Sequence, residues 1–253
     1  MDEPGTSRHG SGFTASEYAS AYADGMERSF WNRARNRVIE RRVRRALAVV
    51  SGKVLDVGCG RGIVVDYLRR SGIDCVGAEI SQAPPLNAAV APHLRLGCDI
   101  ADLPADLTSA VRVALLLDVL EHLPEPNDFL HRCRKTLPAL RALVITLPAR
   151  QELWSNYDEH YGHFQRHRLE DLPGLLAGLP VRSLDTSYFF HALYFPLLIL
   201  AMLGHKRNPE FRPPRGGLAG AIHQVMGSVF SLEDRLMPRH LPGTSLIALA
   251  LLD

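Results

Sequence analysis

The sequence has little lysine and no cysteine pairs with the spacing of metal or redox motifs. Lysine occurs only at Lys53, Lys135 and Lys206, so nearly all of the positive charge comes from arginine. The formal net charge of +2 is too close to zero to indicate a nucleic-acid partner. The four cysteines show no C-x-x-C spacing, and three of them fall in or beside predicted strands. This is typical of buried thiols in a reducing compartment, and it favours a cytoplasmic location.

The sequence also lacks a long apolar run and an export signal. Its longest apolar stretch, 188–203, contains His191 and Pro196. It is shorter than the ~20 residues that a membrane-spanning helix needs. The N-terminal residues are polar and show no charged-then-apolar pattern, so we expect no export. We expect residues 1–12 to be disordered.

The rest of the chain alternates between strand-like and helix-like segments. Predicted strands cover 53–58, 74–80, 93–100, 111–119, 141–148, 181–190 and 243–252. Helical patterns cover 16–50, 62–72, 127–137, the end of 157–180 and a segment that ends near residue 237. This alternation predicts a doubly wound α/β fold with a mostly parallel seven-stranded sheet and helices on both faces. A ligand of such a sheet binds outside the carboxyl ends of its strands.

We expect residues 13–253 to form one domain. Within it we predict a helical cap (13–50), a cofactor-binding half (51–150) and a substrate-side half (151–253) with an apolar lid segment (188–204). The character of the sequence changes after Pro148, where His, Arg and aromatic residues become frequent.

The stretch KVLDVGCGRG (53–62) places an Asp before three glycines at every second position. A dinucleotide loop has the pattern G-x-G-x-x-G, but Ile63 stands where its third glycine would be. A pyrophosphate would be repelled by the carboxylate of Asp56, whereas a ligand with a positive or zwitterionic end would be attracted. S-adenosylmethionine, which carries an ammonium and a sulfonium group, is such a ligand.

VLDVGCGRG resembles the first motif of the class I S-adenosylmethionine-dependent methyltransferases. The later landmarks of that family follow in order, including DVLEHL (118–123), GHFQRHRLEDLPGLLAGLPV and the aromatic–arginine helix SFWNRARNRVI. The resemblance covers about residues 28–185 and the last strand. It implies a Rossmann-like methyltransferase fold of the small-molecule type, with S-adenosylmethionine as the cofactor.

The resemblance also implies roles for individual residues. Glu79 would accept hydrogen bonds from both ribose hydroxyls, because one carboxylate has two acceptor oxygens. Asp99 would accept a hydrogen bond from the adenine amino group, and Asp102 is the alternative residue for this role. Asp118 and Val119 would face the methionine end. The predicted cofactor-binding residues are Asp56, Gly58, Cys59, Gly60, Gly62, Glu79, Ile80, Asp99, Ile100, Asp118 and Val119.

Two classes of nucleic-acid methyltransferase are disfavoured by missing motifs. Residues 118–121 are Asp-Val-Leu-Glu and not the [DN]-P-P-[YF] of adenine amino methylation, and no Pro-x-Cys follows the fourth predicted strand. The segment 33–45 contains seven arginines, which would suit a phosphate backbone or an anionic lipid. The alternative is the solvated face of a helix that packs through Ile39, Val43 and Leu47. We favour this alternative and expect no specific nucleic-acid partner.

Three histidines are candidate catalytic bases. A base is useful for methylating an alcohol or a phenol, and His122, His160 and His163 lie near the expected donor site. Each also has a structural interpretation: His122 as a partner of a backbone carbonyl, and His163 as a residue that shapes the pocket. For His160 the structural interpretation is the stronger of the two.

A metal site is the alternative use of the same segment. Asp118, Glu121 and His122 stand at i, i+3 and i+4, and His163 could add a ligand. The pattern is similar to the metal-binding segment of methyltransferases that act on catechol-type quinone precursors or RNA 3′ ends. It also resembles metal-independent members, so a bound metal is left open.

The apolar segment after residue 188 bears on the methyl acceptor. It either covers an apolar pocket or a dimer surface, or it dips into a membrane interface. Both interpretations favour a bulky, hydrophobic acceptor over a free sugar or amino acid. We expect a methyltransferase that acts at oxygen on such a molecule, either a secondary metabolite or a lipid-linked precursor. A homodimer and a peripheral membrane contact stay open, as does a protein of this fold that binds the cofactor without methylating. The predicted substrate-binding residues are Trp154, Tyr157, Tyr161, Phe164, Tyr188, His191 and Tyr194.

Overall fold

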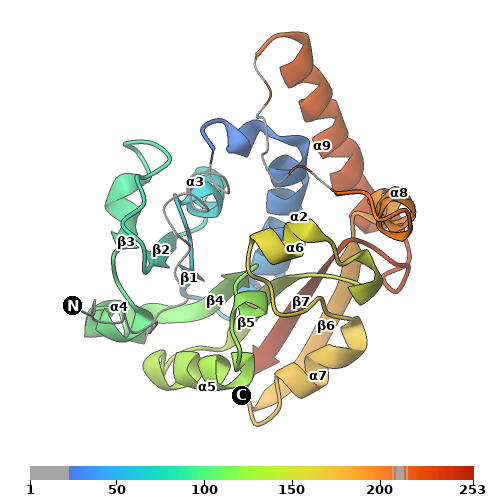
Figure 1. The fold of residues 1–253 in the computed structure, drawn as a ribbon. Coiled ribbons are helices and arrows are strands. Elements are labelled where there is room, and N and C mark those ends of the chain that lie inside the picture. The colour runs from blue at the N-terminus through green and yellow to red at the C-terminus, as the bar shows by residue number, and fades with distance from the viewer. Residues whose placement is uncertain (1–22, 207, 209–213, 215) are drawn as a thin grey trace, which may run out of the picture.

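The computed structural model describes residues 23–206, 208, 214 and 216–253. The segment 1–12, which the sequence predicts to be disordered, lies outside the described residues, as does the beginning of the predicted helical cap. The described chain forms one seven-stranded sheet with helices on both faces (Figure 1).

The sheet has the strand order β3-β2-β1-β4-β5-β7-β6. Strands β1 to β5 pair in parallel, and β7 runs antiparallel to both of its neighbours. The strand order reverses between β1 and β4, which places the ligand crevice at their carboxyl ends. The strands are β1 (Lys53–Val57), β2 (Cys75–Glu79), β3 (Leu94–Leu96), β4 (Val111–Leu117), β5 (Ala142–Pro148), β6 (Val181–Phe189) and β7 (Ser245–Leu252).

Two hydrophobic cores lie on the two faces of this sheet. In β4, Val113 and Leu115 belong to one core, while Ala114 and Leu116 belong to the other, because successive strand residues point to opposite faces. Helices α2 (Phe30–Leu47) and α3 (Ile63–Arg70) cover the first core, and α5 (Pro126–Thr136) and α7 (Leu172–Leu175) cover the second. Apolar residues on both sides explain why β4 is a nearly continuous apolar run.

The first long helix begins later than predicted. Instead of a helix from residue 16, the described chain has a 3-10 turn, η1 (Met26–Arg28), and then α2. Gly25 has a φ of 90°, which an α-helix does not allow. The hydroxyl of Ser29 accepts a hydrogen bond from the backbone N–H of Asn32 at 3.1 Å and so caps α2.

Several strand ends are also corrected. The predicted strands 111–119 and 181–190 end earlier because Asp118 and Phe190 have φ values of 58° and 59°. These left-handed conformations are incompatible with a strand. The remaining short helices are η2 (Ala91–His93), η3 (Ile100–Asp102), α4 (Ala105–Ala110), η4 (Leu120–His122), η5 (Gln151–Leu153), α6 (Asn156–His160) and η6 (Leu169–Asp171).

A long insertion separates β6 from β7, although these two strands are antiparallel neighbours that a short hairpin could join. The insertion contains α8 (His191–Met202) and α9 (Leu218–Leu236). The predicted lid segment 188–204 therefore begins within β6 and continues as α8. Helix α9 lies beside α2 (Figure 1). In the part of the chain that the structure describes, no helix combines the length and apolar character needed to cross a membrane.

Candidate functional site

The glycine loop connects β1 to α3 at the switch point of the sheet. Gly58, Gly60 and Gly62 have φ values of 74°, 54° and 84°, a region that other residues rarely adopt. A Cβ atom at Gly58 would lie 2.9 Å from Cγ2 of Val119, so this position has no room for a side chain. The loop backbone therefore lies close to Val119, just after β4.

Asp56 is the penultimate residue of β1, just before this loop, and is 2% exposed. Its Oδ1 atom has no hydrogen-bond partner. Burial raises the pKa of Asp56 to about 7, with the charge of Arg35 opposing the shift and that of Glu79 adding to it. A buried carboxylate with a free oxygen is suited to bind a cationic group that enters the crevice.

Glu79 lies at the end of β2 and holds the glycine loop in place. Its two carboxylate oxygens accept hydrogen bonds from the backbone N–H groups of Gly60 and Ser81, each at 2.9 Å. Each oxygen has a second lone pair, so the carboxylate can still accept hydrogen bonds from two ligand hydroxyls. Ile80, the next residue, is 49% exposed and offers an apolar surface at the same edge.

The predicted adenine-binding residues lie at the end of β3. The side chain of Asp99 accepts a hydrogen bond from the backbone N–H of Ala101 at 2.9 Å and caps η3. Ile100 is buried in the core, whereas Asp102 is exposed. Cys59 is buried beneath the glycine loop, where its Sγ would lie 2.5 Å from a Cβ atom at Gly77.

Asp118 follows β4 in a left-handed conformation, which costs about 1 kcal/mol or more in a residue other than glycine. Its Oδ2 lies 2.8 Å from the guanidinium of Arg35, and its Oδ1 accepts a hydrogen bond from the hydroxyl of Thr146 at 2.9 Å. Arg35 also donates to the Thr146 hydroxyl at 3.2 Å. These contacts hold the strained residue in the crevice.

Arg35 is the residue that the sequence reasoning missed. The segment 33–45 was expected to be a solvated face, but Arg35 and Arg42 are only 6% and 5% exposed. They stand at i and i+7, with Val38 and Ile39 between them, so they share the apolar face of α2. This spacing could have distinguished the two buried arginines from the solvated arginines of the same helix.

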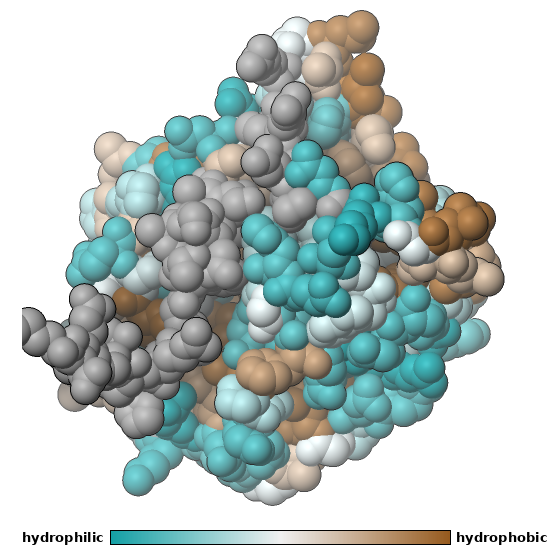
Figure 2. Space-filling model, viewed as in Figure 1, coloured by the Kyte–Doolittle hydropathy of each residue, from teal (hydrophilic) through white to brown (hydrophobic). Residues whose placement is uncertain are grey.

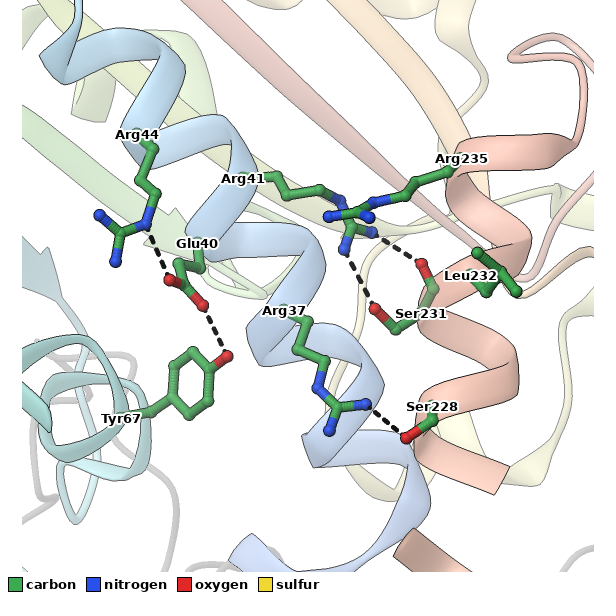
Figure 3. Close-up of a pocket in the computed structure, with 9 residues that line it drawn as sticks. All are labelled: Arg37, Glu40, Arg41, Arg44, Tyr67, Ser228, Ser231, Leu232 and Arg235. Atoms are coloured by element: carbon green, nitrogen blue, oxygen red, sulfur yellow. Dashed lines mark hydrogen bonds and ion pairs between the residues drawn. The ribbon is translucent and has the colours of Figure 1, made fainter. Parts of the chain in front are cut away.

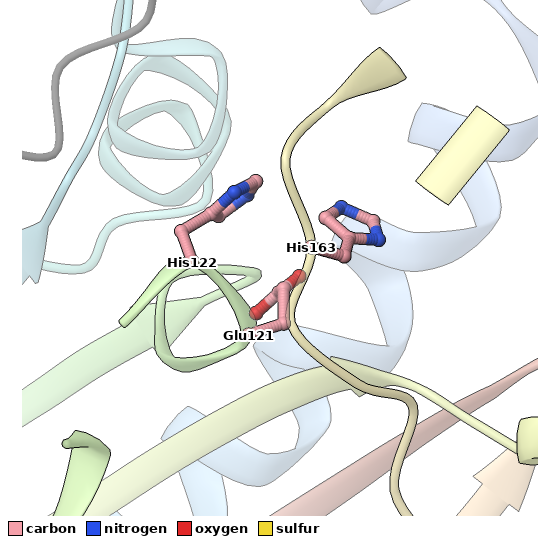
Figure 4. Close-up of side chains that lie close together, drawn as sticks. All are labelled: Glu121, His122 and His163. Atoms are coloured by element: carbon pink, nitrogen blue, oxygen red, sulfur yellow. The ribbon is translucent and has the colours of Figure 1, made fainter. Parts of the chain in front are cut away.

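A second group of side chains lies next to the loop that follows β4. Glu121 and His122 from η4 converge with His163 from the loop after α6 (Figure 4). One ligand atom from each of these three residues lies within 4.8 Å of the others. The predicted ligand Asp118 does not belong to this cluster, because it is ion-paired with Arg35.

The electrostatics of this cluster suit a divalent cation. Glu121 is 1% exposed, and neither of its carboxylate oxygens has a hydrogen-bond partner. Burial and the nearby charge of Asp118 raise the pKa of Glu121 well above its usual range. Burial, followed by the neighbouring His163, lowers the pKa of His122 to about 4. A neutral imidazole and a carboxylate that lacks a partner are ligand types that zinc and similar metals bind.

His163 is held by a buried carboxylate. Its Nδ1 lies 2.9 Å from Oδ1 of Asp158, and Arg166 donates to the same oxygen at 2.8 Å. Burial alone would raise the pKa of Asp158, but the contacts with His163 and Arg166 lower it below its usual value. An ionised carboxylate can only accept, so Nδ1 of His163 donates to Asp158.

Aromatic rings extend this side of the crevice. The rings of Tyr157 and Tyr161 are 4.6 Å apart, His160 packs edge-on against Tyr161 at 4.9 Å, and His122 packs against His163 at 4.8 Å. Around them, Phe164 is 60% exposed and Trp154 is half-buried.

The other predicted substrate residues contact Arg150 and the loop before β7. Tyr188 and Tyr194 flank the guanidinium of Arg150, with ring centroids 5.7 and 5.5 Å away. The ring of His191 is buried, and its Nδ1 lies 3.1 Å from the carbonyl oxygen of Pro242.

The strand order and the glycine loop define the class I methyltransferase fold, which confirms the fold predicted from the sequence. A family model described as a methyltransferase domain matches residues 30–179, which is more than half of the chain. The chain belongs to this methyltransferase-domain family.

Curated relatives match part of the chain. The ubiquinone biosynthesis O-methyltransferase of Photorhabdus laumondii is 27% identical over 120 residues, which cover 44% of this chain and 50% of that protein. The corresponding protein of Erwinia tasmaniensis is 32% identical over 110 residues, which cover 40% of this chain and 45% of that protein. The chain thus spans about half the length of the curated relatives it matches.

Solved structures share the fold at low identity. Haemonchus contortus phosphoethanolamine N-methyltransferase 2 superposes with a TM-score of 0.53 and 13% identity, covering 88% of this chain and 52% of that one. The plantazolicin methyltransferase BpumL superposes with a TM-score of 0.51 and 15% identity, and the match covers 94% of this chain and 89% of that one. Both were solved with S-adenosylhomocysteine. At this level of identity, the likeness shows the fold alone.

The contacts of Asp158 predict its contribution to stability. Replacing Asp158 with Asn leaves the buried guanidinium of Arg166 without its carboxylate, so the free energy of unfolding should fall by about 3 kcal/mol. Chemical denaturation measures this change. The exposed neighbour Glu159→Gln is the control and should change stability by less than about 0.5 kcal/mol. Equal stabilities of the two variants would contradict the role of Asp158.

Proposed function

We propose that this chain is an S-adenosylmethionine-dependent methyltransferase that methylates an oxygen atom of a hydrophobic small molecule. The observation that carries the proposal is the set of acids around the glycine loop at the switch point of the sheet: buried Asp56, Glu79 and the Arg35–Asp118 pair. The experiment is the release of S-adenosylhomocysteine with a panel of phenolic and lipid-linked acceptors. Cofactor binding without release for any acceptor would favour the non-methylating alternative.

The residues present fit the proposed cofactor. The free oxygen of buried Asp56 suits an ammonium group, and Glu79 suits the two hydroxyls of a ribose. Arg35 is a buried guanidinium that could bind the amino-acid carboxylate while it keeps Asp118 in place. When bound, the cofactor supplies an electrophilic methyl group on a sulfonium.

His163 is the residue that we assign to the acceptor oxygen. Asp158 fixes the ring through Nδ1, so Nε2 is free to take the proton that a hydroxyl loses as its oxygen is methylated. The relatives named ubiquinone biosynthesis O-methyltransferases support an oxygen acceptor. The aromatic rings of Tyr157 and Tyr161, with the exposed Phe164, support an apolar one.

A peripheral membrane contact and a cytoplasmic location stay predictions. The exposed side chains of Phe195, Ile199 and Met202 on α8 support an apolar partner for this helix, such as the surface of a bilayer. Flotation with lipid vesicles is the direct measurement of this contact.

A second candidate is metal-assisted O-methylation. The observation that favours it is the cluster of Glu121, His122 and His163, in which both oxygens of Glu121 lack a hydrogen-bond partner. In this candidate the three residues would hold a divalent cation, which would bind the acceptor oxygen as a Lewis acid.

The raised pKa of Asp56 predicts a pH dependence of cofactor binding. Below about pH 7 the free protein holds a proton on Asp56, and this proton must leave before a cationic ammonium can bind. The dissociation constant of S-adenosylhomocysteine should therefore rise by up to about tenfold for each pH unit below 7. Titration calorimetry from pH 5.5 to 8 measures this. Asp56→Asn should bind more weakly and without the pH dependence; a wild-type affinity that is constant with pH would contradict the role of Asp56.

Loss of the His163 ring predicts a catalytic defect without a binding defect. His163→Gln should lower kcat by about 10²- to 10⁴-fold, because the acceptor proton then has no base, while the affinity for S-adenosylhomocysteine stays unchanged. His160→Gln is the matched control and should change kcat only a few-fold. The assignment is wrong if both variants keep the wild-type kcat.

Metal removal separates the two candidates. If His163 acts as a base, the chain should keep full activity in a chelator and hold no stoichiometric metal after purification. If the metal-assisted candidate is right, activity should fall with chelator and return with a divalent cation. Glu121→Gln should then lower metal content, measured by elemental analysis. Full activity in chelator ends the metal-assisted candidate.

A further inference from the structure

Helix α9 carries a regular apolar stripe that is exposed along its whole length. The stripe residues recur at alternating intervals of four and three positions, and each is about half exposed or more. They are Leu218, Ile222, Val225, Val229, Leu232 and Leu236. An amphipathic surface helix turns its apolar face toward the core, so α9 has the reverse orientation.

The opposite face of α9 is fixed to α2. Arg41 donates a hydrogen bond to the hydroxyl of Ser231 at 3.0 Å, and Arg37 donates to the hydroxyl of Ser228 at 3.0 Å (Figure 3). Arg41 also donates to Asp234 at 2.6 Å. A groove of about 570 Å³ lies between the two helices; its lining includes these arginines and serines and also Leu232.

Close packing and one further bond hold α9 in the same orientation. A Cβ atom at Gly227 would lie 2.8 Å from Cβ of Arg33, so the two helices approach closely there. The carboxylate of Glu233 accepts a hydrogen bond from the backbone N–H of Ala192 at the start of α8. Helix α9 therefore cannot rotate its apolar stripe inward without breaking these contacts.

The spacing of the stripe is that of a helix–helix seam. Intervals of four and three average 3.5 residues, the repeat at which the apolar positions of one helix stay in contact with a second helix. The members are Leu, Ile and Val, which are the residues that such seams use. Figure 2 shows these apolar side chains as brown atoms along the outer edge of α9.

We propose that the α9 stripe is an interface for a second copy of this chain, in which the two α9 helices pack against each other. The order of intervals is the same from either end of the stripe, so two identical stripes are self-complementary about a two-fold axis. The exposed apolar area of the six residues is on the order of 700 Å² per chain, close to the ~800 Å² that each partner contributes to an interface of standard size.

The charges of α9 favour a second copy of the chain, and not an anionic lipid surface, as the partner of the stripe. The helix carries Glu233, Asp234 and Arg235 and has no lysine. The exposed residues beside the stripe are uncharged over most of its length, as at Ala221, Gln224 and Ser228. Interfacial membrane helices instead place lysine and arginine beside their apolar face.

The test is the oligomeric state of the full chain. Wild type should be a dimer at micromolar concentration by sedimentation equilibrium and light scattering. Val225→Glu with Val229→Glu places charges at the centre of the stripe and should raise the dissociation constant of the dimer at least 100-fold. Both residues are about 60% exposed, so circular dichroism and the thermal unfolding of the monomer should stay unchanged. Leu218→Glu with Leu236→Glu repeats the test at the two ends.

A matched change on α8 is the control. Phe195→Glu with Ile199→Glu introduces the same charges on exposed apolar residues outside α9 and should leave the dimer intact. The proposal is overturned if wild type is monomeric, if the α9 variants remain dimeric, or if only the α8 variant dissociates. The stripe would instead be a membrane contact if the wild type is monomeric and floats with phosphatidylglycerol vesicles, while the α9 variants do not float. None of these readouts depends on methyl transfer.

Discussion

The contact on which the site depends is the ion pair between the buried Arg35 and the partly exposed Asp118. It joins the N-terminal helix α2 to the carboxyl end of β4, and both partners also bond to the hydroxyl of Thr146 on β5. Arg35 is also the cation whose charge opposes the raised pKa values of Asp56 and Glu121. Without it, the crevice would gather buried acids with no compensating charge, at a cost of several kcal/mol.

This constraint explains why the site has two sides with different chemistry. On the side of β1 and β2, Asp56 and Glu79 surround a loop of glycines and suit a ligand with a positive end and hydroxyl groups. On the side of α6, the buried Asp158 holds the ring of His163 through Nδ1, close to Glu121 and His122. Asp118 lies between the two sides, held in a strained conformation by Arg35, so the donor and acceptor ends of a transfer reaction would meet there.

The sequence predicted those features that depend on neighbouring residues. The glycine loop, Asp56 and Glu79 follow from local order, and all seven strands were placed because each has its own apolar pattern. Arg35 was not found, since its contact with Thr146 spans 111 positions and depends on how α2 packs on the sheet. The exposed stripe of α9 and the stacking of Tyr188 on Arg150 also depend on tertiary packing. The pairing of His163 with Asp158 was likewise missed, although only five positions separate them.

The most direct test of the account is a crystal structure of the chain with S-adenosylhomocysteine. The account predicts the ligand in the crevice between β1 and β4, with its ribose on Glu79, its ammonium at Asp56 and its carboxylate at Arg35. It also predicts that the Arg35–Asp118 contact survives binding. A ligand bound elsewhere, or bound in the crevice with Arg35 turned away and Asp56 without a contact, would contradict the account.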